Sequence, residues 1–425
     1  MTSFDAVMDC LYGPVTFQPE IGRLIGTPVV QRLRHVRLSN IDSLAMPGIS
    51  GGSRFEHVLG VAHLGSQLGF VSRLSRQDAI VLTAAALLHD WAITAFGHLV
   101  EEGFAYAGIQ FDHEHKLDEL AANTDESTEL GGINRQVLCG RESGLGAWIQ
   151  AIAPRDRDTV LDDIVSTIRG KGKFGRVVTG DIDVDNIDGV FRIAHHMGLA
   201  IDKSVPLRLA RAIVGVSPET KEPIYTREAE ALIAAWMDLR GIVYQHLMPA
   251  QPDFAAKLML LRCTMLACEM QEILPQDWNL TDFDFITRLR GSASEECRKT
   301  VDRWQVGEFW NTSPLIWLEG QRPSYAKIAK FSADLTNLLG RQCFAYGIKD
   351  KRVRECRVSW DDGSSSVIGI KPNKWLFGVG TPVRKSFGLQ EIRKLNELAC
   401  KYFETHEVPG DITGEDASES QRTLL

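Results

Sequence analysis

The 425-residue sequence has no Cys-x-x-Cys pair among its eight cysteines, and Cys263 and Cys268, the two closest, stand five positions apart. This is not a zinc-site spacing, so we expect reduced thiols that pack as small hydrophobic side chains. No apolar run reaches the roughly 18–20 residues that a membrane helix needs. The N-terminus has early acids and no apolar core of a signal peptide. The sequence therefore predicts a cytoplasmic protein that makes no use of a membrane.

Positive charge is also in short supply. Lys and Arg number 47 against 55 Asp and Glu, which gives a formal net charge of −8 and argues against a protein that coats nucleic acid. A phosphate-binding P-loop is missing as well, because the glycine-rich stretch Arg169–Arg176 contains no Gly-Lys-Ser/Thr. Its cations could meet phosphates, or the stretch could be an ordinary surface loop.

Helical periodicity dominates the first part of the chain, and residues 76–90 predict a central, buried helix. After about residue 300 the pattern changes to a β-hairpin with its turn at 361–364, a further strand at 374–380 and a closing amphipathic helix at 389–406. We therefore expect a mainly α fold: a helical domain over residues 1–290, a smaller α+β domain over 291–405 for oligomer contacts or regulation, and a flexible tail over 406–425.

Four segments carry side chains that can hold a metal. They contain His57; His89 and Asp90; His113, Glu114 and His115; and Asp181, Asp183, Asp185 and Asp188. Two imidazoles with two carboxylates suit Mn, Fe, Zn or Mg, and such a metal can activate water and neutralise phosphate oxygens. Because neighbours on a helix point about 100° apart, His89 and Asp90 can share one metal only near a helix end. Each position taken alone is more simply a satisfied core histidine or a solvated turn aspartate.

Longer motifs accompany these residues in a fixed order. They are TPVVQRLR from Thr27, PGISGGSRFEHVLGV from Pro47, GDIDVDNID from Gly180 with HHMG after it, and VYQH at Val243–His246. Over roughly residues 5–275 the chain resembles the HD-domain metal-dependent phosphohydrolases. Within them it is most similar to the deoxynucleoside triphosphate triphosphohydrolase branch, which includes the vertebrate enzyme with a SAM domain and an HD domain. The resemblance implies an HD-domain helical core for residues 1–290.

The resemblance also implies a role for each matching residue. The metal ligands would be His57, His89, Asp90 and Asp185, holding a divalent ion of Mn, Fe, Mg, Co or Zn. Arg54 would contact a phosphate. Catalysis would use Asp90 with His113 and Glu114, the pair that supplies the acid for the leaving oxygen. His98 and Glu101 would line the phosphate path, and Tyr244 would pack against the sugar of the nucleoside. Asp181 and Asp183 are then loop or helix-capping residues.

The sequence departs from this family at several polar positions. Apolar residues stand where the family has a histidine after its HD pair, a glutamine near the sugar, an arginine near the γ-phosphate and an aspartate beside the HH pair; they are Ile93, Leu38, Trp236 and Ile193. Gly26 replaces the acidic residue of the nucleotide activator site. Losing a charged contact costs a few kcal/mol of phosphate binding. The metal set is thus complete while the phosphate set is partly apolar.

Three hypotheses follow. The leading one is metal-dependent hydrolysis of deoxynucleoside triphosphates to deoxynucleoside and triphosphate, with nucleotide depletion in antiphage defence as an extension. The second is an HD hydrolase of another phosphoester, such as a nucleoside monophosphate or a signalling nucleotide. The third is a nucleotide-sensing module without turnover. For each, the resemblance implies a nucleotide ligand and a homo-oligomer (dimer, tetramer or hexamer), while regulation by another nucleotide or by a partner protein stays open.

Overall fold

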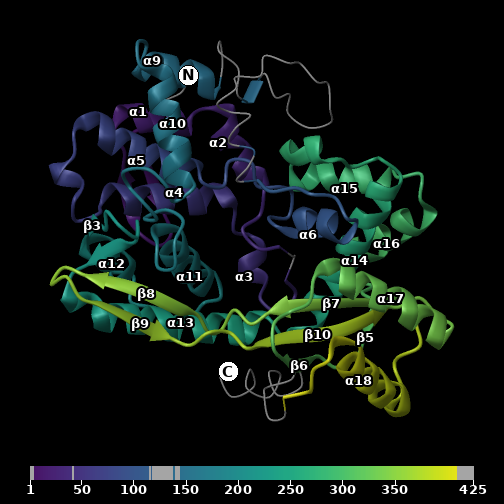
Figure 1. The fold of residues 1–425 in the computed structure, drawn as a ribbon. Coiled ribbons are helices and arrows are strands. Elements are labelled where there is room, and N and C mark those ends of the chain that lie inside the picture. The colour runs from purple at the N-terminus through teal and green to yellow at the C-terminus, as the bar shows by residue number, and fades with distance from the viewer. Residues whose placement is uncertain (1–3, 41–42, 114–115, 117–136, 139–143, 409–425) are drawn as a thin grey trace.

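The computed structural model describes residues 4–40, 43–113, 116, 137–138 and 144–408. Helices make up most of this part of the chain, and the strands form small sheets (Figure 1). The predicted fold class, mainly α with a smaller C-terminal α+β part, is confirmed. No helix in the described ranges is both long and apolar enough to cross a membrane.

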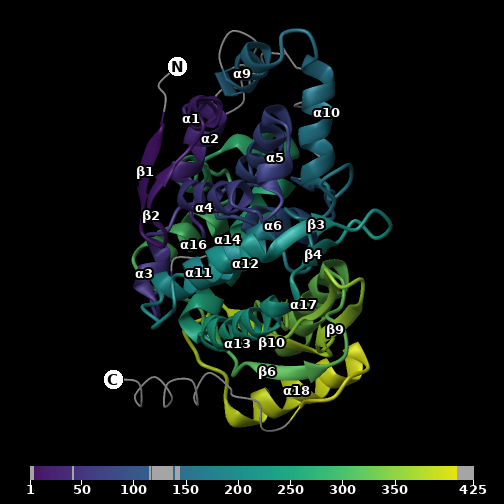
Figure 2. The ribbon, with the colours of Figure 1, turned by 90° about the vertical axis from the view of Figure 1, so that its left-hand side faces the viewer.

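The N-terminal segment begins with strands β1 (Ala6–Asp9) and β2 (Gly13–Thr16), an antiparallel hairpin that the sequence analysis did not predict. It lies along one edge of the molecule (Figure 2). Helices α1 (Pro19–Ile25) and α2 (Pro28–Arg32) follow, and the break between them falls at Thr27 and Pro28, where the proline pattern predicted it. Short helix α3 (Pro47–Ser50) precedes the first site helix.

Two long helices form the centre of the N-terminal half. Helix α4 (Arg54–Ser66) starts at Ser53, whose side chain accepts a hydrogen bond from the backbone N–H of Glu56. Helix α5 (Arg76–Leu88) starts at Ser75 in the same way, and every residue from 79 to 97 is buried. The prediction of a central, buried helix here is confirmed.

Further helices follow along the chain. They are α6 (Leu99–Tyr106), α9 (Leu145–Ile152), α10 (Arg157–Ile168), α11 (Val184–His196), α12 (Val205–Ala212), α13 (Glu230–Leu247), α14 (Gln251–Glu269), α15 (Asp282–Arg290) and α16 (Glu295–Gln305). Short 3-10 helices also occur at Leu33–His35, Val71–Arg73, Arg227–Ala229 and Pro275–Asn279. Helices α4 and α10 both pack on α5, and α11 packs on α4 and α13.

The C-terminal part contains an antiparallel sheet. Strand β10 (Lys374–Thr381) is its centre and pairs with β7 (Phe344–Lys349) on one side and with β6 (Ile316–Glu319) and β5 (Asn311–Thr312) on the other. Helices α17 (Tyr325–Leu339) and α18 (Leu389–Phe403) pack there through ring contacts of Phe331 and Phe403 with Phe377. The predicted strand at 374–380 and the predicted closing helix are confirmed.

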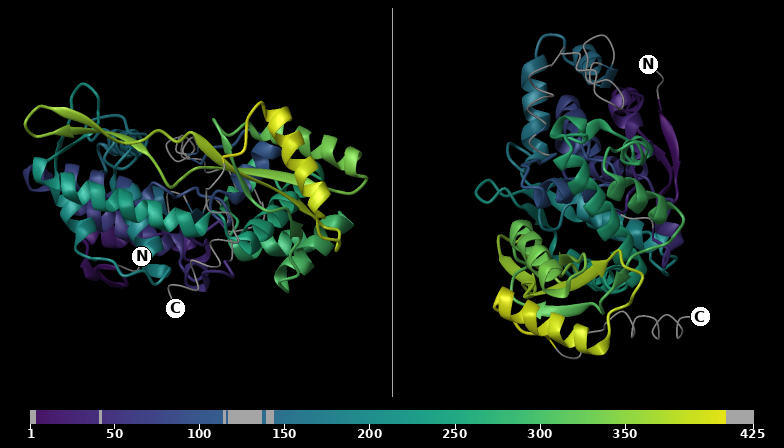
Figure 3. Two further views of the ribbon diagram at one scale, coloured as in Figure 1. Left: turned by 90° about the horizontal axis from the view of Figure 1, so that it is seen from below. Right: turned by 90° about the vertical axis from the view of Figure 1, so that its right-hand side faces the viewer.

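The predicted hairpin is also confirmed, as β8 (Glu355–Trp360) and β9 (Ser365–Gly369). The sequence analysis did not predict the strands that join this hairpin in a sheet. Strands β3 (Ile213–Val216) and β4 (Pro223–Tyr225) form a second hairpin, and β4 pairs in parallel with β8. Seen from below, the β8–β9 hairpin reaches away from α18 to the opposite end of the molecule (Figure 3).

The buried apolar residues form two clusters. One is built around α1, α4, α5, α10 and α11 and includes Val358 and Trp360 of β8. The other joins α6 and α14–α16 to the C-terminal sheet. Each cluster therefore draws on residues before and after position 290, and the domain boundary expected there stays a prediction. Residues 409–425 of the predicted tail lie outside the described residues.

Candidate metal centre

The H…HD…D residues come from three packed helices. His57 lies on α4, Asp185 lies in the first turn of α11, and α5 ends at Leu88 so that His89 caps it and Asp90 follows in a turn. The HD pair thus stands at a helix end, as the geometry of a shared metal required. Asp183 caps α11 by accepting a hydrogen bond from the backbone N–H of Asn186, which confirms its predicted capping role.

The four predicted ligands turn their donor atoms toward one another. His57 Nε2 lies 2.9 Å from Asp185 Oδ1, and His89 Nε2 lies 3.5 Å from the same oxygen. His89 Nε2 is 3.6 Å from Asp90 Oδ2. Ligands about 2.1 Å from one ion are separated from each other by about 3.0–3.4 Å, so these distances are those of neighbouring ligands around a single metal.

The chemistry of His89 shows that the set fits a metal. Its Nδ1 lies 2.9 Å from the carbonyl oxygen of Ala86 and donates a hydrogen to it, so that Nε2 is the ring nitrogen left to bind a metal. This buried Nε2 makes no hydrogen bond to any described residue. A buried imidazole nitrogen 3.5 and 3.6 Å from two carboxylates takes up either a proton or, in place of that proton, a divalent cation.

Asp188 holds His57 in place, and the sequence analysis assigned it no role. Its Oδ1 accepts a hydrogen bond from His57 Nδ1 at 2.7 Å and another from Arg192 Nε at 2.8 Å. Its Oδ2 accepts from Tyr12 Oη at 2.8 Å and Arg192 Nη2 at 2.9 Å. The Asp188 carboxylate thus fixes the imidazole ring of His57 so that its Nε2 faces the other predicted metal ligands. The available signal was its spacing, three residues after Asp185 on one helix face.

Electrostatics keep the carboxylates ionised. Burial raises the pKa of Asp90, but the positive charges of Arg54, whose Nη1 lies 2.6 Å from Asp90 Oδ2, and of His89 and His57 together outweigh burial and hold that pKa well below its usual range. Burial lowers the pKa of His89, while the charges of Asp90 and Asp185 outweigh it and raise the pKa to about 10. The site therefore attracts positive charge, either protons or a metal ion.

A second group of predicted residues lies beside the ligands. Glu101, on α6, accepts hydrogen bonds from His98 Nδ1 at 2.9 Å and His113 Nδ1 at 2.7 Å. His113 Nε2 then faces Asp90 Oδ1 at 3.8 Å. Although burial raises the pKa of Glu101, these two histidines lower it to about 2. Glu114, predicted to act with His113, lies outside the described residues.

The four predicted ligands border one cavity of about 380 Å³, together with Arg54, His98 and His113. Tyr244, the predicted sugar contact, lines it from α13. So do three cations that sequence reasoning missed: Arg240 one turn earlier on α13, Lys257 on α14 and Lys351 after β7. Arg240 Cζ and Lys351 Nζ lie 4.8 and 5.7 Å from the centre of the Tyr244 ring. Only the fold brings these residues together, because they come from separate elements.

The four apolar residues that replace polar residues of the family lie in two kinds of environment. Leu38 and Ile193 line the cavity, whereas Ile93 and Trp236 are buried in the packing. The glycine-rich loop is engaged elsewhere, since Lys173 pairs with Asp78 and Asp163 and Arg176 pairs with Glu222. These ion pairs favour the surface-loop interpretation of Arg169–Arg176.

The converging H…HD…D residues are the ones in which the sequence resembles the HD-domain class of proteins. Similarity to known proteins confirms the resemblance to its deoxynucleoside triphosphate triphosphohydrolase branch. The chain is 25% identical over 254 residues to "Deoxynucleoside triphosphate triphosphohydrolase SAMHD1" of Bos taurus, which covers 53% of this chain and 41% of the bovine protein. It is 26% identical over 211 residues to the protein of the same name from Homo sapiens, and this match covers 45% of this chain and 33% of the human protein.

An uncharacterised protein of Methanocaldococcus jannaschii is 22% identical over 246 residues, which covers 56% of this chain and 46% of the archaeal one. The chain thus spans less than half the length of each of these relatives. No family model matches the sequence.

Proposed function

We propose that the protein hydrolyses deoxynucleoside triphosphates to deoxynucleoside and triphosphate. The observation that carries the proposal is the convergence of His57, His89, Asp90 and Asp185 at a cavity that also holds a cluster of cations around Tyr244. The SAMHD1 relatives, named for this reaction, support it at the level of the family. The four residues would hold a divalent metal, which when bound supplies charge neutralisation for phosphate oxygens and an activated water.

Arg54 and His113 carry the remaining chemistry. The guanidinium of Arg54, buried and anchored to Asp90, faces the cavity and stabilises charge that develops on phosphate oxygens. Hydrolysis breaks the bond between the α-phosphorus and the 5′ oxygen, which must take up a proton as it leaves. His113 donates that proton from Nε2, because Glu101 holds its Nδ1 and stabilises the protonated ring. Glu114 stays a predicted assistant to this step.

Arg240, Lys257 and Lys351 would bind the rest of the phosphate chain. Lys257 is already paired with Glu102, with its Nζ 3.0 Å from the carboxylate. Arg240 is different: its buried Nε has no hydrogen-bond partner among the described residues, and burial lowers its pKa. A polyphosphate would satisfy this donor. These cations compensate for the apolar side chains at 38 and 193, and Tyr244, whose ring lies beside Arg240 and Lys351, would pack on the sugar.

A second candidate is hydrolysis of a nucleoside monophosphate or signalling nucleotide. It is favoured by Leu38 and Ile193, which make part of the cavity wall apolar. Purified protein incubated with single nucleotides and Mn²⁺, Mg²⁺, Fe²⁺ or Co²⁺, followed by chromatography of the products, separates the two. Release of intact triphosphate supports the first proposal, and orthophosphate from a monophosphate supports the second.

Metal binding with a ligand-induced thermal shift but no product would instead support a sensing module. Homo-oligomerisation and nucleotide depletion during phage infection stay predictions. Sedimentation of the purified protein tests the first, and phage plating on cells that express wild-type or His89→Ala protein tests the second.

A further inference from the structure

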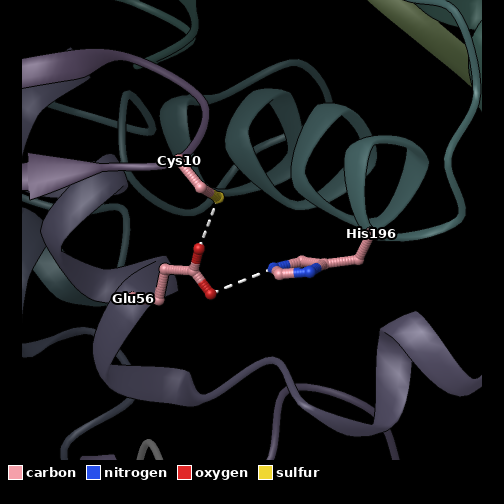
Figure 4. A group of neighbouring side chains, drawn as sticks. All are labelled: Cys10, Glu56 and His196. Atoms are coloured by element: carbon pink, nitrogen blue, oxygen red, sulfur yellow. Dashed lines mark hydrogen bonds and ion pairs between the residues drawn. The ribbon is translucent and has the colours of Figure 1, made fainter.

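Glu56, the residue before His57, belongs to a second group of ligand-type side chains. This group consists of Cys10, which follows β1, Glu56 on α4 and His196 at the end of α11 (Figure 4). Cys10 Sγ lies 2.6 Å from Glu56 Oε1, and His196 Nε2 lies 3.0 Å from Glu56 Oε2. One donor atom from each residue falls within 4.8 Å of the other two. Three separate elements thus present a thiol, a carboxylate and an imidazole to one point.

The charges around the group favour an added cation. Arg192, which is fully buried, contacts three carboxylates: Asp188, Asp9 at 3.1 Å and Glu56 at 3.1 Å. Its Nη1 is also 3.8 Å from Cys10 Sγ. Lys203 Nζ also lies 2.8 Å from the carbonyl oxygen of Cys10, so three carboxylates stand against two cations before the thiol is counted. The carbonyl end of α11, where His196 lies, also favours positive charge.

Close backbone packing fixes the position of His196. A Cβ atom on Gly48, in α3, would lie only 2.2 Å from the carbonyl oxygen of His196. A Cβ on Gly52 would touch the ring itself at 3.4 Å. The chain has glycine at both points where it passes this histidine, so the ring is held against Glu56 by the backbone of the segment before α4.

We propose that Cys10, Glu56 and His196 bind a second divalent metal of borderline softness, such as Zn²⁺, separate from the His57, His89, Asp90 and Asp185 site. A thiolate with an imidazole and a carboxylate is a ligand set for such ions. Binding deprotonates the thiol, and the proton passes to solvent as the Sγ–metal bond forms. The ion ties the β1–β2 hairpin to α4 and α11, the helices that carry His57 and Asp185. The proposal does not depend on the proposed function.

Cobalt substitution tests it, because only a thiolate ligand gives a sulfur-to-cobalt charge-transfer band in the near ultraviolet. The full-length protein is stripped with a chelator and titrated with Co²⁺, and bound metal per chain is counted. We expect the band in the wild type, in Cys400→Ser as a cysteine control, and in the double variant His89→Ala with Asp90→Ala. Cys10→Ser should lose the band and one metal ion per chain.

His196→Gln provides a second variant that keeps the thiol, and circular dichroism verifies that each variant is folded. This variant should bind Co²⁺ at the thiolate at least about tenfold more weakly. A wild-type protein without the band, or a folded Cys10→Ser protein that retains it, overturns the proposal. Neither result bears on the proposed metal site at His57, His89, Asp90 and Asp185, because that site contains no sulfur ligand.

Discussion

Replacing Asp188 by Asn tests how the metal centre is held together. The two side chains have nearly the same shape, but an amide nitrogen cannot accept a hydrogen bond. In the native protein Oδ1 accepts from His57 and Arg192, and Oδ2 accepts from Tyr12 and Arg192. Whichever oxygen becomes the nitrogen, it faces an N–H of Arg192, so no flip of the amide avoids the conflict.

The size of the effect follows from these contacts. Breaking a buried ion pair costs about 3–5 kcal/mol, and we expect the lower end because Arg192 keeps Asp9 and Glu56. Loss of a group that orients a metal-binding histidine weakens metal affinity about 10- to 100-fold. Asp188→Asn should therefore unfold at lower urea concentration and require more metal for the same activity, while its ligand set stays complete.

The assay is a titration of activity against Mn²⁺ concentration, with metal content measured in parallel. Excess Mn²⁺ should restore most of the turnover in Asp188→Asn but none in His57→Ala. Asp334→Asn, the same chemical change on the exposed face of α17, is the matched control and should behave as the wild type. If Asp188→Asn needs no more metal than the wild type, Asp188 does not position His57 and the reasoning fails.

The remaining predictions concern substrate, packing and metal. Arg240→Gln should lower kcat/KM about 10- to 100-fold, mainly through a higher KM, because a charged hydrogen bond is worth about 1.5–3 kcal/mol. The exposed Arg290→Gln is the control. An unchanged KM in Arg240→Gln would show that Arg240 does not touch the substrate. Gly60→Ala should lose about 1–3 kcal/mol of unfolding free energy in a urea titration, because its Cβ would lie 2.1 Å from Asp188 Oδ2. Gly51→Ala is the control: its Cβ would meet nothing closer than 3.9 Å, so its unfolding free energy should stay nearly unchanged. Chelation should abolish turnover and added Mn²⁺ or Co²⁺ restore it; full activity in protein shown to be free of metal would contradict the assignment.

Local patterns were sufficient to predict several parts of the structure. The buried run that ends at His89 gave the central helix and the position of the HD pair at its end, because an apolar segment with that composition has to be covered on all sides. The turn residues at 361–364 placed the β8–β9 hairpin for an equally local reason. Both predictions depended on neighbours in the sequence.

Contacts between distant segments were not predictable in this way. Strand β4 is three residues long and pairs with β8 from the C-terminal part, and nothing in its short pattern indicates that partner. Arg240 and Lys351 meet at Tyr244 only because α13 and the segment after β7 pack side by side. Their positions depend on tertiary packing, which no periodicity in a single sequence encodes.

Anomalous diffraction from crystals grown with Mn²⁺ tests the central claim most directly. The account predicts one strong peak about 2.0–2.3 Å from His57 Nε2, His89 Nε2 and carboxylate oxygens of Asp90 and Asp185. The absence of a peak at these four side chains at saturating Mn²⁺ would contradict it, whether or not a peak lies at Cys10, Glu56 and His196.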